Sequence, residues 1–202
     1  MNNLIAKSIS YEGLRTVFNG DDYKTCTEIK FIESNELKQK LINEAKQFWA
    51  KRFNIDESEV FFGNLTIHDS FNEQYKIILG DASINMHANT SNLIGVVGSL
   101  CACKGDFPKL KFVTNILKVE RECVVSLPKL SHVHGVVLRG CEIKRLPLKK
   151  CVYADLTNSE ICDFHLENVS TLHLNNADYR QGILKCIKHA KTVYVPGGEY
   201  SI

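Results

Sequence analysis

The sequence predicts an α+β protein in which an N-terminal cap containing a helix precedes a parallel-β solenoid. Three observations support this. One amphipathic helical stripe lies between residues 37 and 53. After residue 57 the helical period disappears, and similar apolar patterns return at short, nearly regular intervals. Within each interval, apolar residues alternate as on a strand with one buried face. We therefore divide the 202-residue chain into an α/β capping region, residues 1–57, and the solenoid, residues 58–202.

The capping region contains one clear helix. Ser34 and Asn35 are N-cap candidates, and Asn54 is a candidate stop. The apolar residues of the segment recur at helical spacing and form one stripe, which suits a helix that covers the exposed end of the first coil: Leu37, Leu41, Ile42, Ala45, Phe48, Trp49 and Phe53. Before this helix, residues 14–18 fit a short helix and residues 26–31 alternate like a strand.

The repeats are clearest over residues 127–202. Three units, Leu130–Ile143, Leu148–Ile161 and Leu166–Tyr179, each carry apolar or small residues at relative positions 1, 4, 7, 9, 12 and 14. A fourth unit runs over residues 187–200. The anchor residue at relative position 9 is Leu138, Leu156, Leu174 and Val195 in turn. Pro196-Gly197-Gly198 and Tyr200 are typical of a closing turn.

Weaker units precede these, with anchors predicted at residues 67, 84, 101 and 118. This assignment places Ile116 and Cys101 among core residues. The last unit is irregular because Lys118 occupies its anchor. The sequence therefore leaves two starting points open for the solenoid, one near residue 58 and one near residue 107.

The segment LSHVHGVVLRGCEIKRLP, from Leu130 to Pro147, resembles the leucine-rich-repeat pattern. Cys141 stands where that family has Asn or Cys, and Leu146-Pro147 where it often has Leu-Pro. The period is shorter than is usual for the family, so we expect no helix on the far side of each coil. The resemblance implies a parallel sheet that binds another macromolecule.

A rival interpretation is a pentapeptide-repeat protein, which would form a right-handed β-helix. Three consecutive groups of five, ADLTN, SEICD and FHLEN over residues 154–168, resemble that family. The five-residue period slips before Ala154 and after Leu166, whereas the longer period, which separates Leu138, Leu156 and Leu174, continues through both points. We therefore rank the leucine-rich-repeat resemblance first.

Alternation on the predicted strands directs one set of side chains outward, into columns that run along the solenoid. One column contains Val137, Asp155, His173 and Tyr194. Aromatic side chains and arginine on a rigid sheet are typical of recognition surfaces. We therefore predict a partner-binding surface made of five residues: Arg139, Tyr153, Asp155, His173 and Tyr194.

Composition and charge narrow the class of partner that the protein is expected to bind. The net charge of +2 argues against nucleic acid and gives no membrane bias. The start MNNLIAKSISYEG has no secretory pattern, and the longest apolar run, LIGVVGSLCAC, is too short to cross a membrane as a helix. We expect a cytoplasmic protein whose eight cysteines, without any C-x-x-C pair, are reduced packing residues.

The functional prediction is a non-enzymatic protein–protein interaction module that acts by steric binding or scaffolding, such as an inhibitor of a larger enzyme or complex. No cofactor, metal or small-molecule substrate is expected. One alternative is a solenoid that mimics or binds nucleic acid. Another is a hydrolase using Asp155 and His173 with Ser170 as a third member. A zinc site from His132, His134, Cys101 and Cys103, and a phosphoesterase motif at His68-Asp69-Ser70, are both rejected.

Overall fold

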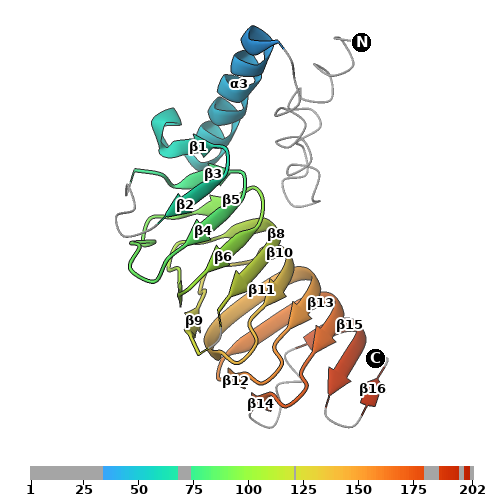
Figure 1. Cartoon of the computed structure of the whole chain (residues 1–202). Helices are drawn as coiled ribbons and strands as arrows, with labels where there is room; N and C mark the ends of the chain where they lie inside the picture. The colour runs from blue at the N-terminus through green and yellow to red at the C-terminus, as the bar shows by residue number, and fades with distance from the viewer. Residues whose placement is uncertain (1–33, 68–73, 121, 180–186, 196–197, 201–202) are drawn as a thin grey trace.

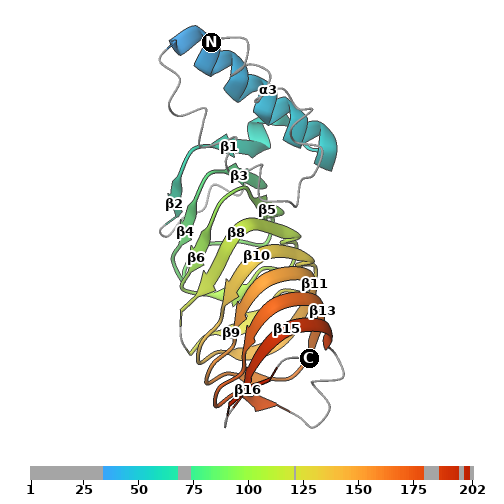
Figure 2. The ribbon, with the colours of Figure 1, turned by 90° about the vertical axis from the view of Figure 1, so that its right-hand side faces the viewer.

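The computed structural model describes residues 34–67, 74–120, 122–179, 187–195 and 198–200. It is a parallel β-solenoid preceded by a single described helix (Figure 1). Figure 2 shows the strands of successive coils stacked below that helix. The features predicted for residues 1–33, for residues 68–70 and for Pro196-Gly197 lie outside the described residues.

Helix α3 (Asn35–Phe53) begins and ends where the sequence predicts. The Ser34 hydroxyl accepts a hydrogen bond from the Leu37 amide at 3.4 Å, and Asn54 closes the helix with a left-handed φ of 52°. Trp49 is fully buried and stacks on Phe112 at a ring separation of 5.2 Å. Gly95 leaves room for the Phe112 ring, because a Cβ at that position would collide with it. The helix therefore caps the first coils.

Parallel pairing begins at Val60, so the earlier of the two starting points is right. A short 3-10 turn, η2 (Glu57–Glu59), leads into it. The main sheet follows the order β1 (Val60–Phe62), β3 (Ile77–Leu79), β5 (Gly95–Val96), β8 (Phe112–Val119), β10 (His132–Val137), β11 (Glu142–Asp155), β13 (Phe164–His173), β15 (Ile187–Val195) and β16 (Gly198–Tyr200). Among the described strands only the last pair, β15 with β16, is antiparallel, and it closes the far end.

Two further rows of strands complete the coils. In the early coils, a row that joins the second half of β8 consists of β2 (Leu65–Ile67), β4 (Ala82–Ile84) and β6 (Leu100–Ala102). In the later coils, a row that joins the first part of β11 consists of β7 (Gly105–Asp106), β9 (Val124–Ser126), β12 (Glu160–Ile161) and β14 (Asp178–Tyr179). The described residues after η2 contain no helix, as the short period predicts.

The predicted register is correct in the later coils and wrong by one position in two early coils. Leu138, Leu156 and Leu174 are all fully buried. Ile67 and Ile84 pair in register, but the next partner of Ile84 is Ala102, and the partner of Ala102 is Val119. Cys101 and Lys118, predicted as anchors, are exposed. The cause is the coil from Ile84 to Ala102, which is one position longer than the coil before it.

A column of small residues lies at the turn between the two rows of the later coils. The Cys123 thiol donates to the Cys103 carbonyl at 3.2 Å, and the Cys141 thiol donates to the Glu120 carbonyl at 3.3 Å. In the next coil the Ser159 hydroxyl donates to a main-chain carbonyl in the same way. Burial raises the pKa of Cys141 to about 11. These thiols are therefore protonated donors that satisfy turn carbonyls.

The same turns share a left-handed residue at one position. Glu122, Gly140, Asn158 and Asn176 have φ values of 64°, 66°, 58° and 53°. Asn and Gly tolerate this conformation better than other residues. Because the same turn recurs in each of these coils, the coils that carry it have nearly the same length.

Candidate functional site

The five residues predicted to bind a partner form one connected row on the outer face of the main sheet. Arg139 follows β10, Tyr153 and Asp155 end β11, His173 ends β13, and Tyr194 lies on β15. Strand register aligns Val137 with Asp155, Asp155 with His173, and His173 with Tyr194. Stacked strands lie about 4.8 Å apart, so neighbouring members of the row contact one another.

Asp155 occupies the centre of the polar part of this row. Arg139 contacts its Oδ2 through Nε at 2.6 Å and Nη2 at 2.5 Å. The Tyr153 hydroxyl donates to the same oxygen at 3.0 Å, and the Thr157 amide donates to Oδ1 at 3.1 Å. The carboxylate is therefore held by four donors from two adjacent coils.

Asp155 faces outward, as the alternation predicts, but its neighbours cover it almost completely. Its neighbours Ala154 and Leu156 point into the core, so Asp155 points outward, yet it is only 2% exposed. Arg139, half-exposed, and Tyr153 cover it. Burial alone would raise the pKa of Asp155, but the hydrogen bonds from Arg139, Thr157 and Tyr153 outweigh burial and hold that pKa below its usual value. Asp155 orients its neighbours from beneath.

The aromatic part of the row continues from Tyr153. The His173 ring lies 5.3 Å from the Tyr153 ring at a tilt of 56°. On its other side, His173 stacks on Tyr194 at 4.3 Å with an angle of 8° between the planes. The three rings are partly exposed, so they present a continuous aromatic surface along three coils. Burial, followed by the hydrogen bond to Asp155, raises the pKa of Tyr153.

An open groove adjoins the polar end of the row. It is lined by Ile116, Lys118, Val119, Glu120, Glu122, Val137 and Arg139. Ile116 is 42% exposed, and its register partner Gly135 has no side chain to separate it from Tyr153 in the next coil. The groove therefore has an apolar floor beside charged side chains of both signs.

The prediction that Ile116 lies in the core is wrong. It follows from placing Lys118 at the anchor position of that coil. The structure buries Leu117 and Val119 instead, which turns Ile116 and Lys118 outward. The alternation along Phe112–Val119 could have predicted this. Alternate residues share a side of the strand, so burying Ile116 would bury Lys118 as well, whereas burying Leu117 and Val119 leaves the lysine exposed.

The alternative catalytic set is not assembled as a triad. The hydrogen bonds to Asp155 among the described residues come from Arg139, Tyr153 and Thr157, and His173 packs between two tyrosine rings. Ser170 lines a different groove. In the described part of the chain, no three His, Cys, Asp or Glu side chains are grouped closely enough to hold a metal ion.

Comparisons with protein-family models, with curated proteins and with solved structures found no match. Within the residues that the structure describes, no helix is long and apolar enough to cross a membrane.

Proposed function

We propose that this protein is a non-enzymatic interaction module that binds another protein through Arg139, Tyr153, His173 and Tyr194, which the buried Asp155 helps to orient, and through the adjoining groove at Ile116. The observation that carries the proposal is the continuity of this surface. A partly exposed aromatic stack joins, through the buried Asp155, to a groove with an apolar floor. Apolar centres with polar rims and aromatic or arginine anchors are typical of protein interfaces.

The rigidity of the row supports the same proposal. Tyr153 and Arg139 are both held by the Asp155 carboxylate, and Tyr194 is held by stacking on His173. Side chains fixed before binding lose less conformational entropy when a partner arrives. The partner that fits is a protein presenting an apolar or aromatic side chain to Ile116 and Val137, with a carboxylate near Arg139. Such binding acts by occupying the partner's surface, and inhibition of a larger enzyme or complex is one form of it.

The leucine-rich-repeat resemblance is part of this proposal. What supports it is the turn position of Cys123 and Cys141, whose thiols donate to main-chain carbonyls where that family has Asn or Cys. A cytoplasmic location is proposed as well. It is supported by the six described cysteines, which are all free.

The test is affinity capture from native lysate with three forms of the protein. The test variant, Ile116→Ser/Tyr194→Ala, removes one side chain from the groove and one from the aromatic stack. The control, Met86→Ser/Val124→Ser, removes two other exposed apolar side chains that lie outside the surface. We expect a protein retained by the wild type and the control to be lost by the test variant, with all three forms giving the same circular dichroism. Equal capture by all three would overturn the assigned surface.

A further inference from the structure

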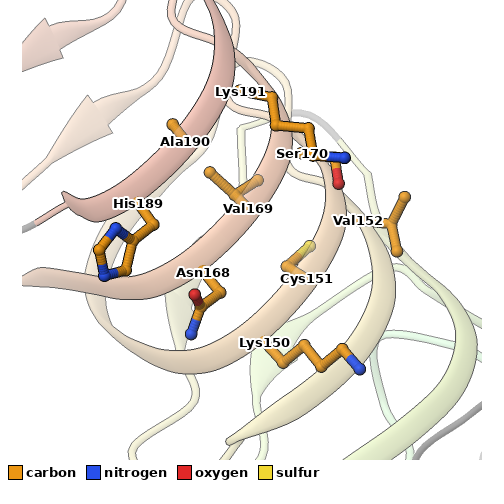
Figure 3. Close-up of a pocket in the computed structure, with 9 residues that line it drawn as sticks. All are labelled: Lys150, Cys151, Val152, Asn168, Val169, Ser170, His189, Ala190 and Lys191. Carbon is orange, nitrogen blue, oxygen red and sulfur yellow. The ribbon is translucent and has the colours of Figure 1, made fainter. Parts of the chain in front are cut away.

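A second groove lies on a different part of the coil, just before the point where three adjacent strands bend. It spans residues 150–152 of β11, 168–170 of β13 and 189–191 of β15, with a volume of about 320 Å³. Figure 3 shows two rows of side chains with small residues between them. One row is Lys150, Asn168 and His189, the other is Val152, Ser170 and Lys191, and between them lie Cys151, Val169 and Ala190.

The bend has a simple cause in the burial pattern. Cys151 and Ala154 both point into the core, which leaves two consecutive residues, Val152 and Tyr153, on the outside. The strand therefore changes direction between them. The same spacing recurs in the two following coils, with Val169 and Leu172 and with Ala190 and Val193 buried. The bends stack from coil to coil, and the groove lies over the three residues that precede the bend in each strand.

The charged side chains that line this groove are all positive. Lys150 and Lys191 line it, and its described lining contains no acidic side chain. Lys149 precedes Lys150 on the same strand. The ion pairs among the described residues include none of Lys149, Lys150 and Lys191. The positive field extends to the neighbouring coil: burial, followed by the charges of Lys149 and Lys150, lowers the pKa of His132.

The polar groups of the lining are hydrogen-bond donors in an arrangement that suits an oxyanion. The ammonium groups of Lys150 and Lys191 can only donate, and the Ser170 hydroxyl can donate as well. The Asn168 amide nitrogen donates one hydrogen to the Lys149 carbonyl at 3.5 Å, and its second N–H can donate to a ligand. Three stacked strands spread these donors over about 10 Å. That length exceeds one phosphate and matches two linked phosphates or a phosphate joined to a further group.

We propose that this groove binds an oxyanion of the phosphate class, held between Lys150 and Lys191. Ser170 and Asn168 contact its oxygens from the middle strand, and His189 closes one side. The groove is separate from the aromatic row and its use does not depend on the protein partner proposed above. A failure of one proposal therefore leaves the other standing.

The test is a titration of the ¹⁵N-labelled full chain with inorganic pyrophosphate, followed by amide chemical shifts at constant ionic strength. We expect saturable shifts confined to residues 150–152, 168–170 and 189–191. Lys150→Gln/Lys191→Gln should weaken binding about tenfold or more, because charge-assisted hydrogen bonds to the anion are lost. The control Lys40→Gln/Lys51→Gln removes the same charge from helix α3 and should bind as the wild type does. Dispersed spectra of both variants verify folding.

A phosphoserine peptide and its unphosphorylated twin distinguish the source of the phosphate. A phosphoserine peptide that binds this groove more tightly than pyrophosphate, while its unphosphorylated twin does not bind, would indicate a phosphate carried by a protein chain. Tighter binding of pyrophosphate would indicate a free anion. Shifts that rise without saturation, that spread to lysines outside the groove, or that persist unchanged in Lys150→Gln/Lys191→Gln would overturn the proposal. So would binding of a single-stranded oligonucleotide without binding of pyrophosphate.

Discussion

The guanidinium of Arg139 lies 2.5 Å from the carboxylate of Asp155, which belongs to the next coil of the solenoid. The two residues differ in exposure: the Arg139 side chain is 50% exposed, whereas that of Asp155 is 2% exposed. A half-exposed cation therefore covers a buried anion, and Tyr153 shares the same carboxylate oxygen. This arrangement makes the polar end of the row sensitive to any loss of the Asp155 charge.

Replacing Asp155 by Asn should destabilise the fold. The substitution keeps the size of the side chain but removes the charge and leaves donors of Arg139, Tyr153 and Thr157 without full partners. We expect a loss of about 1–3 kcal/mol in the free energy of unfolding, measured by urea denaturation. Asp163→Asn is the control, because that carboxylate is exposed and its contact with Arg145 is 3.7 Å long. Equal stability of the two variants would contradict the supporting role of Asp155.

The contribution of Asp155 should depend on pH in a defined direction. Its pKa in the folded state is held below the unfolded value of about 3.9, so folding favours the charged form. The stabilisation is fully present above the unfolded pKa and is lost as pH falls through the folded pKa. The stability difference between wild type and Asp155→Asn should therefore be constant from about pH 5 to 7 and shrink below about pH 4. A difference that grows on acidification would show that the sign is wrong.

The stack of His173 on Tyr194 should be measurable as a coupling. Rings packed at this distance contribute about 0.5–1.5 kcal/mol beyond the burial of their area. A double-mutant cycle with His173→Ala and Tyr194→Ala, followed by urea denaturation, isolates this term. The matched cycle pairs Tyr194→Ala with Val124→Ala, which lies on the other row of strands and should give no coupling. Additive effects in the first cycle would contradict the stacked row.

Four of the six described thiols should fall into two classes of reactivity. Cys101 and Cys162 are exposed, whereas Cys141 and Cys151 are buried. Burial raises the pKa of Cys151 to about 12, so its reactive thiolate is suppressed as well. Brief alkylation of the native protein, followed by peptide mass spectrometry, should label Cys101 and Cys162 first. Labelling of Cys141 or Cys151 at the same rate as Cys101 would contradict the register of these coils.

Trp49 is the only tryptophan of the chain and reports on the contact between helix α3 and the solenoid. It is fully buried against Phe112 and Phe53. Truncation of Trp49 to Ala should cost about 3–5 kcal/mol of stability. In the wild type, its fluorescence should be blue-shifted and should move to the red in the same urea transition that circular dichroism follows. A red-shifted spectrum of the native protein would mean that the helix does not cap the coils.

The sequence by itself determined the solenoid, the capping helix and the register of the later coils. The coils from Leu130 onward keep one length until the last, so the column of Asp155, His173 and Tyr194 follows from counting. Ser34 and Asn54 marked the helix ends because capping is local. A regular period and helix-capping hydrogen bonds involve residues at known spacing along the chain, so both can be predicted without the tertiary structure.

Where the length of a coil changes, only the tertiary structure decided which side chains are buried and which are exposed. One additional residue between Ile84 and Ala102 turns Cys101 from the core to the surface. The same shift continues in the next coil and exposes Ile116. The burial of Asp155 depends on Arg139 from the preceding coil, and the fit of Trp49 depends on Phe112, which lies far along the chain. These properties result from packing between coils, and packing is set by side-chain volume and direction across strands rather than by spacing along one strand.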